Sequence, residues 1–161
     1  MINICLMNNL KDALAVNHIE AEDYTPAYNG ESAGLDLFNA GDNVTILPQK
    51  VLPKSQKTLI RTGLKMQVPK GYVALVQERG SITKTPLKVR AGVIDSGYTG
   101  EVFVNLINTG SEEYRLDAYT KLPVQVVVVK CDNHFSIVDE EEYLNITESS
   151  QRKSGKIGSS D

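Results

Sequence analysis

The sequence predicts an all-β domain built as a sandwich or a distorted barrel. Short segments rich in β-branched and aromatic residues recur along the chain, turn-forming Gly, Pro and Asn residues separate them, and only one segment has helical spacing. Many short strands joined by such turns are typical of these folds. The 161 residues, 41% of them hydrophobic and 23% charged, are enough for one domain with its own core.

Residues 1–68 are predicted to form several strands and one short helix. Strands are expected over residues 2–7, 35–38, 44–47 and 57–68. Residues 9–16 predict a short helix, because Leu10, Ala13 and Leu14 recur at helical spacing. Gly63 interrupts the long strand and predicts a β-bulge there.

Further strands are predicted after residue 71, and a polar segment is predicted to follow them. These strands are expected over residues 72–76, 89–94, 102–106 and 126–129. The continuous β-branched run 126–129 predicts a strand covered on both faces. The acidic run 139–142 predicts a solvated segment, and the Gly/Ser-rich residues 148–161 predict a flexible C-terminal arm. We therefore divide the chain into a β domain, 1–147, and this arm.

Composition excludes several functional classes. The formal net charge of −3 gives no general attraction to nucleic acid or to an anionic membrane. No run approaches the length of a membrane span, and the N-terminus has no basic residue before its short apolar run, so we expect a cytoplasmic protein. Cys5 and Cys131 are too few for a disulfide framework or a thiolate metal site, and we expect both to be small buried side chains.

The stretch 91–102 is the most informative part of the chain. It reads as a strand, a turn that displays Asp95 and Tyr98, and a second strand. Gly97 and Gly100 suit the tight or positive-φ backbone of a turn. On its own the stretch fits an ordinary hairpin tip equally well, because Asp, Ser and Gly are common turn formers.

Four other segments contain residues suited to binding a phosphate or a metal ion. Asp36 lies between apolar residues on a predicted strand, and Gln125 lies among β-branched residues. Arg79-Gly80-Ser81 can surround a phosphate with a guanidinium, a hydroxyl and N–H donors. Residues 152–160 bring cations, hydroxyls and glycines together on a strip suited to a lid. Each has an ordinary structural explanation when taken alone.

In this order and at these separations, the five segments resemble the five motifs of the trimeric deoxyuridine triphosphatase (dUTPase) family, over roughly residues 25–161. The resemblance implies a jelly-roll-like subunit, a homotrimer whose sites are shared between chains, and hydrolysis of dUTP to dUMP and pyrophosphate. That reaction would limit uracil in DNA and supply dUMP for thymidylate synthesis. The resemblance also implies Mg²⁺ as cofactor.

The same resemblance implies a role for each motif residue. Asp95 would activate the attacking water, and Tyr98 would pack under the deoxyribose. Asp36 would bind Mg²⁺ indirectly, through water. The residues expected to read the uracil are Ala91, Gly92, Val93 and Phe103; those expected to hold phosphates are Arg79, Gly80, Ser81 and Gln125; and those expected to close from the arm are Arg152, Ile157, Gly158, Ser159 and Ser160.

The chain departs from the family pattern at three places. The usual Arg-Ser-Gly order is Arg79-Gly80-Ser81 here, which displaces the serine by one position. Leu122-Pro123 replaces a charged and an aliphatic residue, which affects the local turn more than the chemistry. Ile157 replaces a Phe that covers the uracil, a loss of about 0.5–1.5 kcal/mol of stacking, so we expect weaker substrate closure.

Two alternative functions remain open from the sequence. A dCTP deaminase, or a bifunctional relative, shares the fold but needs a catalytic Glu about where Asn105 stands, and Glu101 lies too close to the turn to replace it. A jelly-roll regulatory or binding module without turnover is the other, and a regulatory protein partner could also accompany catalysis.

Overall fold

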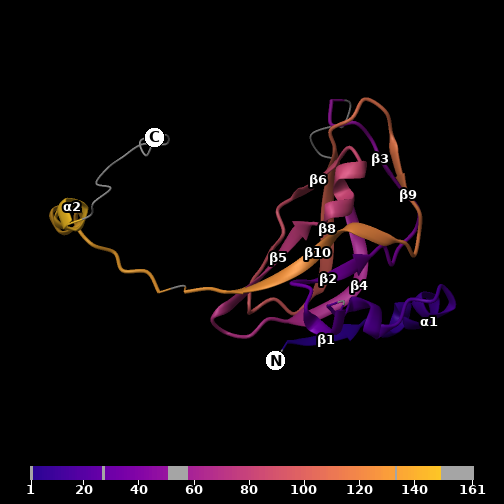
Figure 1. Ribbon diagram of the computed structural model, residues 1–161, viewed down its shortest axis with the longest axis horizontal. Coiled ribbons are helices and arrows are strands. Elements are labelled where there is room, and N and C mark those ends of the chain that lie inside the picture. The colour runs from indigo at the N-terminus through magenta and orange to yellow at the C-terminus, as the bar shows by residue number, and fades with distance from the viewer. Residues whose placement is uncertain (1, 27, 51–57, 133, 150–161) are drawn as a thin grey trace.

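The computed structural model describes every residue except 1, 27, 51–57, 133 and 150–161 (Figure 1). Its strands are β1 (Asn3–Leu6), β2 (Gly34–Phe38), β3 (Val44–Ile46), β4 (Leu59–Gln67), β5 (Tyr72–Glu78), β6 (Leu87–Arg90), β7 (Val93–Ile94), β8 (Glu101–Asn108), β9 (Tyr114–Leu116) and β10 (Lys121–Lys130). Its helices are α1 (Asn8–Val16), α2 (Glu140–Ser149) and the short 3₁₀ helices η1 (Ala21–Tyr24), η2 (Tyr28–Gly30) and η3 (Gly80–Lys84).

Two antiparallel four-stranded sheets make up the body, in the orders β1-β4-β8-β6 and β2-β10-β5-β7. A smaller pair, β3-β9, extends one end of the body (Figure 1). Apolar side chains from the two large sheets form one core, with Leu37, Ile60, Val104, Val124 and Val126 almost completely buried. The predicted all-β fold and the short helix over residues 9–16 are confirmed.

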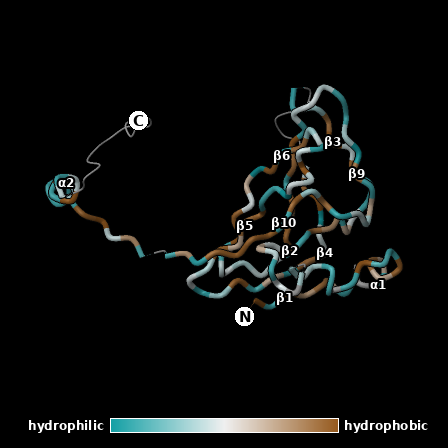
Figure 2. Tube along the Cα trace, viewed as in Figure 1, coloured by the Kyte–Doolittle hydropathy of each residue, from teal (hydrophilic) through white to brown (hydrophobic). Residues whose placement is uncertain are grey.

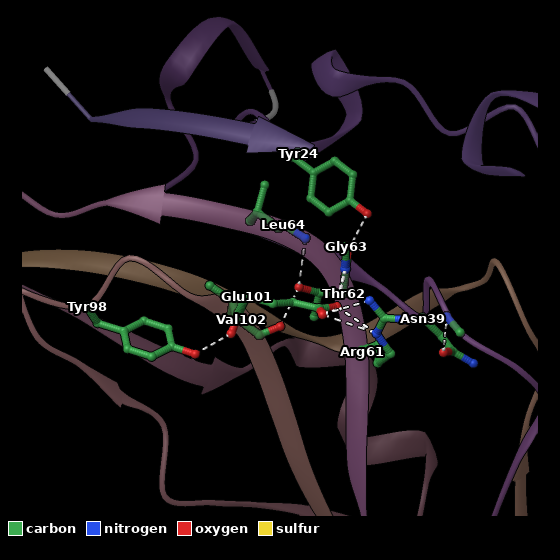
Figure 3. A network of polar contacts seen from close by, with 10 residues as sticks. Tyr24, Asn39, Arg61, Thr62, Gly63, Leu64, Tyr98, Glu101 and Val102 are labelled. Carbon is green, nitrogen blue, oxygen red and sulfur yellow. Dashed lines mark hydrogen bonds and ion pairs between the residues drawn. The ribbon is translucent and has the colours of Figure 1, made fainter. Parts of the chain in front are cut away.

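The predicted bulge at Gly63 is confirmed and lies where β4 pairs with β8. Gly63 has φ +66°, and the register shifts between Arg61 and Lys65. Such a bulge removes backbone groups from the ladder, so side chains must satisfy them. The Thr62 hydroxyl donates to the Val102 carbonyl at 2.6 Å and accepts from the Leu64 amide at 3.3 Å (Figure 3).

The predicted strand 89–94 is in fact two strands in different sheets. β6 pairs with β8, whereas β7 pairs with β5. Ala91 (φ +60°) and Gly92 (φ +108°) make the turn between them. The positive φ values of the motif therefore fall before Asp95. Of the two alternatives for Gly97 and Gly100, a tight turn or a positive φ, the positive φ was wrong, whereas Gly97 does lie in a turn.

Several smaller predictions were also wrong. The run 126–129 is not covered on both faces: Val126 is buried, but Val129 is exposed, because only one face of β10 packs on the opposite sheet. Cys5 is exposed, since β1 lies at a sheet edge, and Cys131 is partly exposed. β9 was not predicted, because three residues carry too little periodicity.

After β10 the chain leaves the body and leads to α2 (Figure 1). Figure 2 shows an apolar stretch on the way, where Phe135 and Ile137 are exposed. α2 has no buried residue, and its first turn consists of three glutamates, which are favourable near a helix N-terminus. The acidic run is solvated as predicted, but we did not predict that it begins a helix. Most of the predicted arm, residues 150–161, lies outside the described residues.

Candidate functional site

The turn between β6 and β7 places the motif 91–102 at the edge of the second sheet. The Val76 amide donates to the Gly92 carbonyl at 2.8 Å, which ties the turn to β5. A Cβ atom on Gly92 would lie 3.0 Å from the Val76 Cβ and 3.1 Å from its carbonyl oxygen. Glycine is needed here for both its φ and this close approach.

A pocket of about 210 Å³ lies between the β7 side of the motif and the start of β8. Its lining consists of Gly92, Val93, Ile94, Asp95, Tyr98, Val102 and Phe103. Val93, Tyr98 and Phe103 are 66%, 43% and 42% exposed, so three large apolar groups form an open rim. An exposed carboxylate beside such a rim suits a flat apolar ligand with a reactive group at its edge.

Tyr98 is held by the backbone on both sides of the turn. Its amide donates to the Asp95 carbonyl at 3.0 Å, and its hydroxyl donates to the Glu101 carbonyl at 2.6 Å (Figure 3). The ring lies against Gly100, where a Cβ atom would be only 2.6 Å from the hydroxyl oxygen. Gly100 is therefore required by the close approach of the ring rather than by its backbone angles.

A second group of polar side chains gathers around Asp36 on β2. One carboxylate oxygen lies 2.7 Å from Arg79 Nε, and the other lies 3.0 Å from Lys121 Nζ. The Asp36 side chain is only 18% exposed, so both cations are held at the surface by a shielded anion. Two adjacent cations of this kind are suited to a phosphate chain.

Pairing between β2 and β10 brings Gln125 opposite Asp36. The Gln125 amide donates to the Glu78 carbonyl at 3.4 Å, and its side-chain oxygen fills the space above Gly34. The Arg79 amide donates to the carbonyl of Pro123, the proline that interrupts regular pairing in β10. The predicted residues Asp36, Arg79 and Gln125 are thus neighbours.

Gly80 and Ser81 open η3, directly after Arg79. Ser81 is exposed and lines a separate pocket of about 310 Å³, which Lys121 also lines. Ser81 therefore shares a pocket with Lys121, one of the two cations that contact Asp36.

The predicted residues form two groups rather than one site. Asp95, Tyr98 and Phe103 line the hairpin pocket, whereas Asp36 and Arg79 belong to the ion-pair cluster. Among the described residues, no hydrogen bond or ion pair joins the groups. Ala91 shapes the turn but does not line the pocket. The predicted arm residues, Arg152, Ile157, Gly158, Ser159 and Ser160, lie outside the described residues.

Sequence reasoning missed Lys121 and the ion pair between the half-exposed Arg61 and the buried Glu101. Lys121 pairs with Phe38 and Gln125 pairs with Asp36, so β10 advances four residues where β2 advances two. This bulge brings Lys121 close enough to contact Asp36. The apolar run that directly follows Glu101, residues 102–104, was a usable signal, because a carboxylate at the start of a buried strand needs a partner.

In the described part of the chain, no three His, Cys, Asp or Glu side chains are grouped to hold a metal ion. Asp36 offers one carboxylate whose oxygens already face two cations. Such a carboxylate fits the acceptance of a hydrogen bond from water on a hydrated Mg²⁺ better than direct ligation, since Mg²⁺ keeps its waters readily. The residues therefore fit an indirect metal role. None of the described helices is long and apolar enough to cross a membrane.

Comparison with known proteins places similar sequences in one family. The dUTPase family model matches residues 20–161. The deoxyuridine 5′-triphosphate nucleotidohydrolase of Chlamydia caviae is 36% identical over 148 residues, covering 89% of this chain and 97% of that protein. The protein of the same name from Escherichia phage T5 is 35% identical over 115 residues, covering 70% and 78%.

Solved structures share the fold, which is the jelly-roll-like arrangement expected from the motifs. A Staphylococcus bacteriophage 80alpha dUTPase with dUpNHpp superposes with a TM-score of 0.71 at 23% identity, covering 99% of this chain and 98% of that one. A dUTPase from phage phi11 of S. aureus, in which a structural Mg(II) ion is coordinated, gives 0.65 at 22% identity, covering 87% and 97%. With its motifs, its fold and its relatives in agreement, this chain belongs to the dUTPase family.

Proposed function

We propose that the protein hydrolyses dUTP to dUMP and pyrophosphate, with Asp95 activating the attacking water. The observation that carries this proposal is the position of Asp95, whose carboxylate lies at the rim of an apolar pocket of about 210 Å³. Family membership and relatives named deoxyuridine 5′-triphosphate nucleotidohydrolases support the reaction. The product dUMP would serve thymidylate synthesis, and removal of dUTP would limit uracil in DNA.

In the reaction, the water oxygen bonds to the α-phosphorus while Asp95 accepts a proton from it. The bond between the α-phosphorus and the oxygen that bridges to the β-phosphate breaks, and pyrophosphate leaves. A positioned carboxylate of this kind contributes about 10²–10⁴-fold to a rate. When bound with the triphosphate, Mg²⁺ would neutralise charge on the phosphates.

The pocket residues would select the nucleotide. Uracil would lie between Gly92, Val93 and Phe103. The deoxyribose would rest on the ring of Tyr98, whose hydroxyl is held by the Glu101 carbonyl. A 2′-hydroxyl would then meet the ring instead of water, which disfavours UTP. Backbone groups near Ala91 complete the turn that shapes this slot.

The cluster around Asp36 would hold the triphosphate. Arg79, Lys121 and Gln125 would contact phosphate oxygens, and Ser81 or its amide would add a further donor. Asp36 would accept hydrogen bonds from water on Mg²⁺. From the arm, Arg152, Ser159 and Ser160 would close over the outer phosphates, while Ile157 and Gly158 would cover the base.

The two groups of residues would meet only when chains assemble, in a homotrimer whose sites are shared. Support comes from the lack of any bond between the hairpin pocket and the Asp36 cluster among the described residues. The test mixes two inactive variants, Asp95→Asn and Arg79→Ala, after dissociation and reassembly. About a quarter of the sites would then combine an intact pocket with an intact Arg79, restoring about a quarter of the activity. No recovery would place the whole site in one chain.

The reaction itself is tested by pyrophosphate release from dUTP, dTTP, dCTP and UTP, with and without Mg²⁺. We expect strong preference for dUTP, and loss of turnover but not of nucleotide binding in Asp95→Asn. Ammonia release from dCTP would instead support a deaminase. The structure speaks against that alternative, because the Glu101 carboxylate contacts Arg61 and the Gly63 amide and does not line the pocket.

A further inference from the structure

The start of β8 is anchored to β4 by one buried carboxylate. Glu101 is only 9% exposed, and its Oε1 accepts a hydrogen bond from the Gly63 amide at 3.0 Å. That amide belongs to the bulge residue, which has no regular partner in β8. The Glu101 side chain therefore takes the place of a missing ladder bond.

The charge of this carboxylate is matched by Arg61. Arg61 Nε lies 3.2 and 3.1 Å from the two carboxylate oxygens, and its terminal NH2 group donates to Oε2 at 2.9 Å. Figure 3 shows this pair beside Thr62, whose carbonyl accepts the hydroxyl of the buried Tyr24 at 2.9 Å. Planar, charge-assisted contacts of this kind fix direction as well as distance.

The same residue holds the pocket through its backbone. The Glu101 carbonyl accepts the Tyr98 hydroxyl at 2.6 Å, and the next two residues, Val102 and Phe103, line the pocket. The side chain of Glu101 thus fixes a peptide group that sets the position of the Tyr98 ring on one side and the strand bearing Phe103 on the other.

We propose that the Arg61–Glu101 pair is a positioning device that sets the sugar selectivity of the pocket. Its role rests on the proposed function, since selectivity is defined for dUTP against UTP. Neither side chain lines the pocket, so both act through Tyr98 and β8 rather than by touching the nucleotide. A looser anchor lets the ring retreat, which makes room for a 2′-hydroxyl.

The test compares kcat/KM for dUTP with kcat/KM for UTP in the full chain, at a temperature well below every variant's Tm. Glu101→Gln keeps the shape but loses the charge, and Arg61→Met removes the partner. We expect the ratio of kcat/KM for dUTP to kcat/KM for UTP to fall about tenfold in each of these two variants, because sub-ångström misplacement has effects of this order. The change should appear mainly in the KM values for the two nucleotides. Arg61→Lys, which keeps the charge without the fork, should give an intermediate ratio.

Two further variants separate positioning from stability. Tyr98→Phe removes only the hydroxyl. In that background we expect Glu101→Gln to lower the dUTP/UTP ratio by less than about a further threefold, because both changes release the same ring. Glu113→Gln, in the exposed pair with Arg115, is the matched control and should leave the ratio unchanged. If Glu101→Gln does not fold, the two Arg61 variants still test the proposal.

A lower Tm with an unchanged dUTP/UTP ratio in the folded variants would overturn the proposal, since the pair would then be structural only. Full additivity with Tyr98→Phe would also overturn it. If the wild-type chain binds dUMP but releases no pyrophosphate from dUTP, the proposed function fails, and the ratio of calorimetric Kd values for dUMP and UMP tests the pair in the same way. A wild-type chain that binds neither nucleotide would overturn both.

Discussion

Replacing Gly100 by Ala should move the Tyr98 ring while leaving the fold intact. The new Cβ would lie 2.6 Å from the Tyr98 hydroxyl oxygen and 2.8 Å from the ring carbon that bears it, and ordinary contact begins near 3.4 Å. The hydroxyl end must therefore retreat by about 0.8 Å. The obstructing atoms are the far end of a side chain that is 43% exposed, so the ring can swing outward.

The energetic consequences can be separated. The retreat breaks the hydrogen bond from Tyr98 to the Glu101 carbonyl, a loss of about 1 kcal/mol, while alanine gains about 0.4–1 kcal/mol by restricting the unfolded chain. Stability should therefore change little. A displacement of this size at a substrate-positioning group costs about tenfold to a hundredfold in catalytic efficiency, so kcat/KM for dUTP should fall by at least about tenfold.

Pyrophosphate release measures kcat/KM, and thermal unfolding measures stability in the same samples. Gly97→Ala is the matched control in the same turn, because a Cβ there has no atom within 4 Å and Gly97 has no positive φ. Equal kinetics for the two variants would refute the assignment of Tyr98 as a substrate contact. A large loss of stability in Gly100→Ala alone would show that the ring cannot swing and would refute the geometric reasoning.

Three further predictions concern other parts of the structure. Gly92→Ala should lower the free energy of unfolding, measured by urea denaturation, by about 2 kcal/mol or more, because φ at Gly92 is +108° and the new methyl would lie 3.0 Å from the Val76 Cβ. Burial, with smaller contributions from nearby carboxylates, raises the pKa of Tyr24 in the folded protein. As pH rises above about 10, the Tyr24 hydroxyl therefore ionises in the unfolded chain before it ionises in the folded one. Unfolding free energy should then fall with pH by up to about 1.4 kcal/mol per pH unit, and Tyr24→Phe should remove that slope in denaturation curves recorded between pH 9 and 11. Asp36→Asn should raise the Mg²⁺ concentration for half-maximal dUTP turnover about tenfold, and an unchanged Mg²⁺ titration would contradict its indirect metal role.

Periodicity and turn chemistry predicted much of the fold because they are local. The alternation of β4 and β8, the bulge at Gly63 and the helix α1 follow from residue spacing within a few positions. The break at Ala91 was missed, since an alanine at positive φ is favoured only by its neighbours in space, here the tie between Gly92 and β5. β9 and α2 were missed because one is too short to show a period and the other has no buried face.

The all-β class, the five motifs and the types of group they carry can be read along the chain, because strand periodicity and motif spacing are properties of a linear chain. Which groups meet depends on how the folded strands pair. It placed Lys121 beside Asp36 through a bulge, and it turned Glu101 away from the pocket toward Arg61. The physical reason is that partners of buried charges, and the atoms that crowd a glycine, come from strands distant in sequence.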